Sequence, residues 1–227
     1  MIKVILWDID GTILNFLKSE NYAIKKCFAA FGIENCDDAM VARYSLINKK
    51  YWEMLERGEI TKPQVQRGRF EEHFANEGIA FSDYDGLNKM YQVALGDKIF
   101  FNDDCFELLK NLKGRYKQYA VTNGTITAQE NKLRQSGLDK IFDGVFISDK
   151  IGFEKPSEGF FDAVFREIGE YGKDEILIVG DSLTSDITGG NNTGILCCWY
   201  NPDGLPNNKN LRIDYEIKNL NEIMNIL

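Results

Sequence analysis

The stretch IKVILWDIDGT, residues 2–12, joins an apolar run to a pair of aspartates. Residues 2–7 are almost continuously apolar, which is typical of a strand buried on both faces of a parallel sheet. Asp8 and Asp10 follow at once, and two carboxylates at positions i and i+2 of an extended chain point to the same side. Gly11 allows a sharp turn just beyond them. Because neighbouring carboxylates repel, this pair needs a cation, a proton or a hydrogen-bond network beside it.

Further apolar runs repeat this arrangement along the chain, each followed by polar or turn-forming residues. These runs are Tyr116–Thr122, Val145–Ser148, Glu175–Val179 and Ile195–Tyr200. Helical patterns lie between them, at Asp103–Lys113, Ile126–Ser136, Ser157–Gly169 and from Leu183. The alternation of strand, turn and helix predicts an α/β protein with a doubly wound, Rossmann-like parallel sheet. Ligands of such sheets bind at the carboxyl ends of the strands.

Residues 15–98 break this alternation. They are rich in helix formers, contain Pro63 as their one proline, and space apolar residues as helices do, for example at Phe70 and Phe74. We therefore expect an α/β core domain made of residues 1–14 and 99–227. Residues 15–98 are predicted to form an inserted α-helical cap domain.

Charge and cysteine usage narrow the function classes. The chain carries 27 basic and 35 acidic residues, a net charge of −8, which disfavours binding to nucleic-acid polymers. Its five cysteines form no CxxC pair, and His73 is the one histidine, so we expect reduced thiols and no structural zinc. No 18 apolar residues stand together, and the first apolar run is too short for a signal peptide. These features predict a cytoplasmic protein with no membrane partner. We expect a monomer or a homodimer, a choice that these features do not decide.

A second acidic cluster, GDSLTSD, follows the apolar run that ends at Val179 and contains Asp181 and Asp186. Carboxylates gathered from two strand ends suit the oxygen coordination that Mg²⁺ prefers. An N-cap role in the following helix is the alternative interpretation of such an aspartate. A calcium loop at Asp8 and Asp10 is excluded, because the residues after them lack the remaining oxygen ligands.

Two smaller signals lie between these clusters. Thr122, Asn123 and Gly124 end a predicted strand with side-chain and backbone donors that could bind phosphate oxygens. Lys155 precedes a predicted helix and could add a positive charge. Taken alone, Thr-Asn-Gly is also an ordinary turn, and a single lysine is usually a surface residue. The order of all four signals along the chain is more informative.

The order Asp-x-Asp-Gly-Thr, Thr-Asn-Gly, Lys-Pro and Gly-Asp-x-x-x-x-Asp resembles that of the haloacid dehalogenase superfamily of phosphohydrolases. The helical insertion after the first motif is similar to the first cap type of that superfamily. The resemblance implies that Asp8 is the nucleophile and Asp10 the general acid and base. It further implies that Thr122 and Lys155 bind phosphate and that Asp181 is a metal ligand.

The cofactor implied by the resemblance is Mg²⁺, held by the Asp8 and Asp181 carboxylates and the Asp10 backbone carbonyl. Asp186 would support this site from behind the ligands. The implied activity is a Mg²⁺-dependent phosphomonoesterase with a small-molecule phosphate substrate. Dehalogenation is disfavoured, because members that release halide lack an aspartate at the position of Asp10. A β-phosphoglucomutase-like phosphomutase or a sugar phosphatase remains open, as does a non-enzymatic phosphate-binding or partner-binding module that kept the fold.

The stretches at residues 48–52, 66–70 and 147–152 are similar to those of bacterial pyrimidine 5′-nucleotidases in this superfamily. That similarity implies nucleoside 5′-monophosphates such as UMP, dUMP or dTMP as substrates. His73 is either a base contact or an ordinary helix-face residue. The other expected substrate contacts are Phe16, Tyr51, Trp52 and Arg67 at the nucleoside, and Asn123 and Gly124 at the phosphate.

Overall fold

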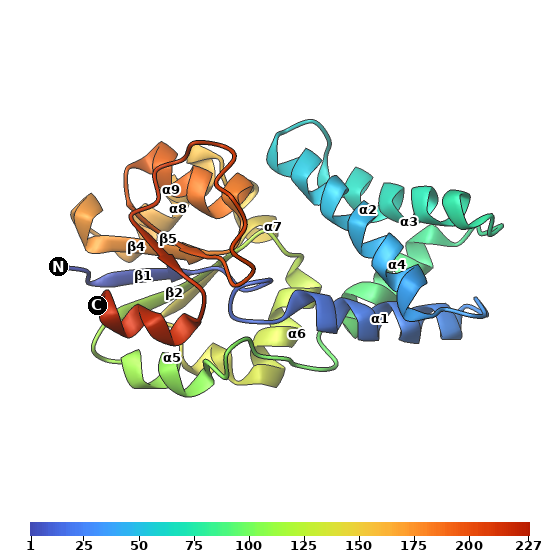
Figure 1. The fold of residues 1–227 in the computed structure, drawn as a ribbon, viewed down its shortest axis with the longest axis horizontal. Coiled ribbons are helices and arrows are strands. Elements are labelled where there is room, and N and C mark those ends of the chain that lie inside the picture. The colour runs from blue at the N-terminus through green and yellow to red at the C-terminus, as the bar shows by residue number, and fades with distance from the viewer. The chain divides into compact units, whose positions relative to one another are not determined.

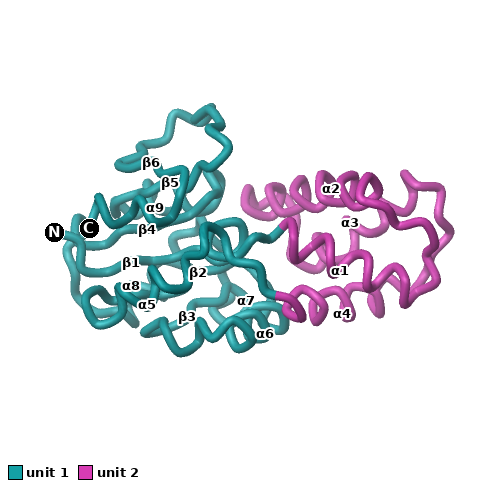
Figure 2. Tube along the Cα trace, turned by 60° about the horizontal axis from the view of Figure 1, so that its bottom comes forward, with its two compact units in different colours: residues 1–16, 99–227 teal, residues 17–98 magenta.

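The structure is a computed structural model that describes residues 1–227 (Figure 1). The chain divides into two compact units, shown in separate colours in Figure 2. Unit 1 comprises residues 1–16 and 99–227, and unit 2 comprises residues 17–98. None of the helices is both long enough and apolar enough to cross a lipid bilayer.

Unit 1 is built on a six-stranded parallel sheet with the order β3-β2-β1-β4-β5-β6. β1 lies between β2 and β4, and its four residues are fully buried, as its apolar sequence predicts. The predicted doubly wound parallel sheet is confirmed. The strands are β1 (Val4–Trp7), β2 (Lys117–Thr122), β3 (Gly144–Ile147), β4 (Ile176–Gly180), β5 (Leu196–Tyr200) and β6 (Tyr215–Ile217).

Helices cover both faces of this sheet (Figure 1). Ile5 and Trp7 face a hydrophobic cluster shared with α5, α6 and the C-terminal segment η4, whereas Val4 and Leu6 face a cluster shared with α8. This alternation is the two-residue period of a strand. The helices are α5 (Phe106–Leu112), α6 (Ile126–Ser136), α7 (Ser148–Ile151), α8 (Glu158–Ile168) and α9 (Thr188–Thr193). The shorter helical segments are η1 (Leu138–Lys140), η2 (Lys173–Glu175), η3 (Leu183–Ile187) and η4 (Leu220–Asn225).

Two local predictions for unit 1 need correction, and one strand was not predicted. The helix expected from Asp103 begins only at Phe106, because Asp103 and Asp104 adopt left-handed backbone angles (φ 53° and 49°). The helix expected from Leu183 is a single wide turn, η3, followed by the separate helix α9. β6 was not predicted, because this three-residue edge strand has only one buried side chain and no apolar run.

Unit 2 is entirely helical. Its core is aromatic, and the rings of Tyr44 and Phe70 lie 5.2 Å apart between centroids. His73 is fully buried among the rings of Phe28, Tyr44 and Phe74, which places it in the interior of the bundle rather than on its surface. The helices are α1 (Phe16–Ala30), which starts in unit 1, α2 (Asp38–Glu56), α3 (Lys62–Glu77) and α4 (Tyr84–Ala94).

A polar network is enclosed within this bundle. Asn48 donates from Nδ2 to Oε1 of Glu20 at 2.7 Å, and Arg69 donates to Oδ1 of Asn48 at 2.9 Å. All three side chains are buried. Burial raises the pKa of Glu20 above its ordinary value, although its hydrogen bonds and the charge of Arg69 act in the opposite direction.

Candidate active site

The carboxyl ends of three neighbouring strands bring the four sequence motifs together. Asp8 directly follows β1, Thr122 is the last residue of β2, and Asp181 directly follows β4. The segment between α7 and α8 contributes Lys155 to the same place, where its side chain contacts Asp8. This edge of the sheet lies where the strand order reverses around β1, the position at which open α/β sheets bind ligands.

Lys155 is the buried centre of the cluster. Its Nζ donates to Oδ1 of Asp8 at 2.8 Å, to Oδ1 of Asp186 at 2.6 Å and to the carbonyl of Val121 at 2.8 Å. An ammonium group has three hydrogens, so all its donors are used. The sequence alone had left open a solvated surface lysine, and the burial of Lys155 rules that interpretation out.

Asn123 holds the main chain of Lys155 in place. Its Nδ2 donates to the Lys155 carbonyl at 2.9 Å, and its Oδ1 accepts from the Lys155 backbone N–H at 2.7 Å. The structure adds a positioning role to Asn123, which the sequence predicts as a phosphate ligand.

Thr122 and Gly124 close the same turn. The Gly124 backbone N–H donates to Oγ1 of Thr122 at 3.0 Å, and Thr122 is buried. A side chain at Gly124 would collide with Gln129, since a Cβ there would lie 2.1 Å from its Nε2. The glycine therefore makes room for a side chain of α6.

The cluster holds more negative than positive charge. The pKa of Asp8 is raised to about 7, because burial and the charge of Asp186 together outweigh the opposing effect of Lys155. Burial and the charges of Asp8 and Asp186 also raise the pKa of Asp181 well above its usual range. Burial acts to lower the pKa of Lys155, but Asp186 and Asp8 outweigh it, so that pKa is raised. Three carboxylates facing one ammonium favour a further cation.

The donor set fits Mg²⁺. Asp8, Asp181 and Asp186 each offer an oxygen within 4.8 Å of the others, and Oδ2 of Asp8 is buried without a hydrogen-bond partner. Hard divalent cations prefer such carboxylate oxygens. Both Asp186 oxygens are already engaged, one with Lys155 and the other with the backbone N–H of Ser182 at 3.2 Å. Asp8 and Asp181 are therefore the better ligands.

Gly11 and Thr12 of the first motif fix the position of Asp181. Thr12 donates from Oγ1 to Oδ1 of Asp181 and accepts from its backbone N–H, both at 3.0 Å. Gly11 has φ 98°, and a Cβ there would lie 2.5 Å from Oδ2 of Asp181. From the sequence, only a turn is expected at Gly11 and no role is expected at Thr12, although both belong to the Asp-x-Asp-Gly-Thr motif.

The carboxylate of Asp10 accepts hydrogen bonds from two residues outside the Lys155 cluster. Gln129 donates from Nε2 to its Oδ2 at 2.6 Å, and Lys132 donates from Nζ to its Oδ1 at 2.5 Å. Both donors come from α6 and are buried. Neither residue is predicted from the sequence, because nothing near them in the chain marks Asp10 as their partner.

Comparison with known proteins places this arrangement in a family. The sequence model of the haloacid dehalogenase-like hydrolases matches residues 2–194. The chain belongs to the haloacid dehalogenase-like hydrolase family. This match confirms the family that was predicted from the four ordered motifs. It also confirms the prediction that the protein is a hydrolase.

Two bacterial proteins are similar to this hydrolase over nearly their full lengths. HAD-hydrolase YfnB of Bacillus subtilis is 37% identical over 227 residues, which cover 99% of this chain and 95% of YfnB. A crystal structure of YfnB bound to magnesium matches the fold with a TM-score of 0.93, at 36% identity, covering 100% of this chain and 98% of that one. Pyrimidine 5′-nucleotidase PynA of Streptococcus pneumoniae is 34% identical over 228 residues, covering 99% of this chain and 94% of PynA.

A further relative is pyrimidine 5′-nucleotidase YjjG of Escherichia coli. It is 29% identical over 184 residues, covering 81% of this chain and 80% of YjjG. These relatives support the assignment of this hydrolase to the subgroup recognised from residues 48–52, 66–70 and 147–152.

The remaining predicted substrate residues of the hydrolase are divided between the two units. Phe16 belongs to unit 1, where Lys132 Nζ lies 5.3 Å from the centre of its ring. Tyr51 and Trp52 on α2 and Arg67 on α3 belong to unit 2. The Arg67 guanidinium is paired with Glu71, 2.6 Å away, and Asp85, 3.7 Å away.

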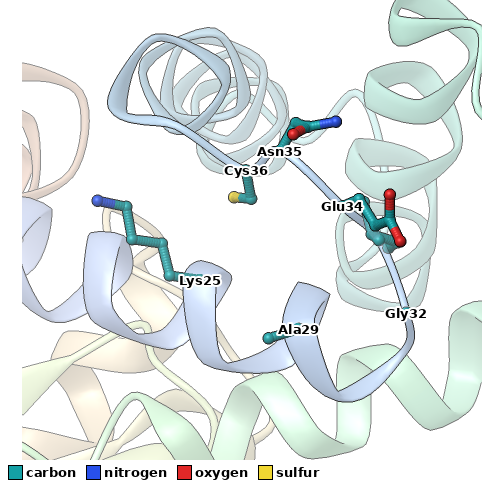
Figure 3. A pocket seen from close by; sticks show the side chains of 7 residues that line it. Lys25, Ala29, Gly32, Glu34, Asn35 and Cys36 are labelled. Atoms are coloured by element: carbon teal, nitrogen blue, oxygen red, sulfur yellow. The ribbon is translucent and has the colours of Figure 1, made fainter.

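Unit 2 of the hydrolase also contains a pocket of about 660 Å³ between α1 and the loop that follows it (Figure 3). Lys25, Ala29 and residues 32–36 line it. None of the predicted catalytic or substrate residues contributes to this pocket, and the cluster of Asp8, Lys155, Asp181 and Asp186 lies in unit 1.

Proposed function

We propose that this protein is a Mg²⁺-dependent phosphomonoesterase that hydrolyses nucleoside 5′-monophosphates, preferably those of pyrimidines. The observation that carries the proposal is the environment of Asp8. One of its oxygens is held by Lys155 at 2.8 Å, while the other is buried without a partner beside Asp181. A carboxylate fixed at one oxygen and unpartnered at the other is suited to act as a nucleophile and metal ligand.

The reaction would proceed in two displacements at phosphorus. In the first, an oxygen of Asp8 forms a bond to phosphorus while the bond to the nucleoside oxygen breaks, and Asp10 gives that oxygen a proton. In the second, water attacks the phosphorus of the aspartyl-phosphate and gives a proton to Asp10. The bond to Asp8 breaks, inorganic phosphate leaves, and both aspartates return to their starting states.

Charge around the transferred group favours this sequence. Lys155 keeps a positive charge beside Asp8, and the turn at Thr122 adds a hydroxyl and backbone donors nearby. When bound by Asp8 and Asp181, Mg²⁺ supplies positive charge that offsets the repulsion between a carboxylate and a phosphate. The magnesium named with the YfnB crystal structure supports this choice of ion.

The preference for nucleotides rests on the relatives. PynA and YjjG are named pyrimidine 5′-nucleotidases, and PynA is similar along almost the whole chain. We further propose that residues 15–98 serve as the cap domain and that Tyr51, Trp52 and Arg67 contribute to substrate selectivity. Replacing Trp52 by alanine should then raise KM for UMP more than KM for p-nitrophenyl phosphate.

The test is release of inorganic phosphate from a panel of nucleotides and sugar phosphates, with Mg²⁺ and with EDTA. We expect pyrimidine monophosphates to be the best substrates and EDTA to abolish turnover. An undiminished rate in EDTA would contradict the proposed metal dependence. Isomerisation of a sugar phosphate without net phosphate release would instead indicate a phosphomutase, and inactivity towards the whole panel would favour a binding module.

A further inference from the structure

Both oxygens of the Asp10 carboxylate are held by side chains of a single helix. Lys132 Nζ lies 2.5 Å from Oδ1, and Gln129 Nε2 lies 2.6 Å from Oδ2. The two donors stand three residues apart on α6, so they share one helix face. Lys132 is 1% exposed and Gln129 is fully buried, whereas the Asp10 side chain remains 22% exposed. Two buried side chains thus bind a carboxylate that is still partly exposed to solvent.

The helix that carries these donors is itself fixed in place. α6 begins directly after the Thr-Asn-Gly turn, and its N-cap Thr125 accepts from the backbone N–H of Ala128 at 3.3 Å. Gly124 leaves the space that Gln129 fills, since a Cβ there would lie 2.1 Å from Nε2. The Thr-Asn-Gly turn and the two residues that hold Asp10 therefore belong to one continuous segment, residues 122–136.

The contacts of Gln129 and Lys132 both favour their bonds to Asp10. The Oε1 atom of Gln129 is buried without a hydrogen-bond partner. The hydrogen bond from its Nε2 to Asp10 therefore sets the orientation of the Gln129 amide. Lys132 is a buried cation whose charge is matched by Asp10, while its Nζ lies over the Phe16 ring. A buried ammonium without an acidic partner is strongly disfavoured, so this pair keeps its geometry.

We propose that Lys132 and Gln129 are positioning residues for Asp10, which hold its carboxylate in the one orientation that serves both proton transfers. This inference rests on the phosphatase chemistry proposed above. A carboxylate oxygen has more than one lone pair, so each Asp10 oxygen can accept these bonds and still face a reacting oxygen. Fixing the carboxylate removes the orientational freedom that would otherwise slow proton transfer.

The test compares Lys132→Met and Gln129→Leu with the matched control Arg134→Met. Arg134 is an exposed cation on the same helix that donates to Asn131. General acid–base catalysis contributes ~10²–10⁴-fold, and we expect the two test variants to lose ~10–100-fold in kcat for UMP. Because neither side chain binds substrate, KM should change less than ~3-fold. Arg134→Met should behave as wild type, and Lys132→Arg should recover most of the lost rate.

A substrate with a good leaving group separates positioning from general damage. p-Nitrophenolate departs without a proton, so only the hydrolysis step then needs Asp10. Lys132→Met should release a burst of nearly one p-nitrophenolate per chain, followed by slow turnover. A variant that was merely misfolded would lose the burst as well. A Lys132→Met enzyme with wild-type kcat, or with slow turnover and no burst, would overturn the proposal.

A thermodynamic cycle tests the contact even if no phosphatase activity is found. Asp10→Asn, Lys132→Met and the double variant are compared by thermal unfolding. Coupled neighbours are non-additive, and we expect the double variant to melt ~2–4 °C above the additive value. Additive effects would overturn the proposed pairing. Inactivity of the wild type together with a non-additive cycle would instead contradict the phosphatase proposal while leaving the pairing intact.

Discussion

The Nζ atom of Lys155 lies 2.8 Å from Oδ1 of Asp8, and both side chains are buried at the carboxyl end of β1. The same ammonium lies 2.6 Å from Asp186. One lysine therefore stabilises two carboxylates that would otherwise repel each other. The site can leave the second oxygen of Asp8 unpartnered because Lys155 supports the first.

Removal of this lysine should destabilise the core. Lys155→Met leaves Asp8 and Asp186 facing each other without a cation, and breaking a buried pair in this way costs about 3–5 kcal/mol. We expect a loss of this size in urea unfolding measured in EDTA. The control is Lys150→Met, because the exposed Lys150 side chain pairs with Glu130. This substitution should lower the free energy of unfolding by less than about 1 kcal/mol. Equal stability of the two variants would refute this role.

Substitution of Gly11 should weaken Mg²⁺ binding at the proposed metal site, in addition to its effect on stability. In Gly11→Ala the new Cβ would lie 2.5 Å from Oδ2 of Asp181, so the carboxylate must move. We expect at least a ~10-fold higher Mg²⁺ concentration for half-maximal activity. Gly114→Ala is the matched control, because Gly114 also has positive φ (79°) but has no atom within 4 Å of its added Cβ. Both variants should lose about 1–2 kcal/mol from backbone strain, and an unchanged magnesium response in Gly11→Ala would contradict the assignment.

The buried Glu20 should make unit 2 less stable as pH rises. Its pKa is raised above the ordinary 4.5, so the folded state binds its proton more tightly than the unfolded state does. The stability from this group is complete below pH ~4.5 and is lost as pH rises through the raised value. Glu20→Gln, which stays neutral, should therefore gain in melting temperature over wild type as pH increases. Glu34→Gln, at an exposed position of unit 2, should show no such trend, and a trend of opposite sign for Glu20→Gln would refute the argument.

Thiol reactivity should be confined to one cysteine. Burial raises the pKa of Cys27, Cys105 and Cys198 to about 12 each, and Cys197 is equally buried. Cys36 is only half-buried, and thiolates at accessible sites react first. Native protein treated with N-ethylmaleimide should carry its first adduct at Cys36, found by peptide mass spectrometry. Rapid labelling of several cysteines, or unchanged labelling in Cys36→Ser, would contradict this expectation.

The sequence predicted the parts of the fold that depend on local pattern. Apolar runs located the first five strands to within two residues, and the polar residues after them located Asp8, Thr122 and Asp181 at one edge of the sheet. β6 was not predicted, because this three-residue edge strand contains no apolar run.

The partners of site residues could not be predicted in the same way. Gln129 and Lys132 are 119 and 122 residues from Asp10 in the chain, and only the packing of α6 beside β1 brings them together. Nothing in the sequence indicates that the side-chain amide of Asn123, a predicted phosphate ligand, also bonds the main chain of Lys155. Residue types indicated the chemistry, and tertiary contacts decided which partner each group has.

The proposed mechanism requires that Asp8 carry the phosphoryl group during turnover. The direct measurement is acid quenching of the enzyme during turnover of its best substrate, followed by peptide mapping. With Mg²⁺, we expect phosphate on the peptide that contains Asp8, approaching one per chain. EDTA should prevent its formation, and Asp8→Asn should lack it and lose at least ~10³-fold in kcat. Wild-type turnover by Asp8→Asn, or phosphate trapped on another residue, would contradict the account.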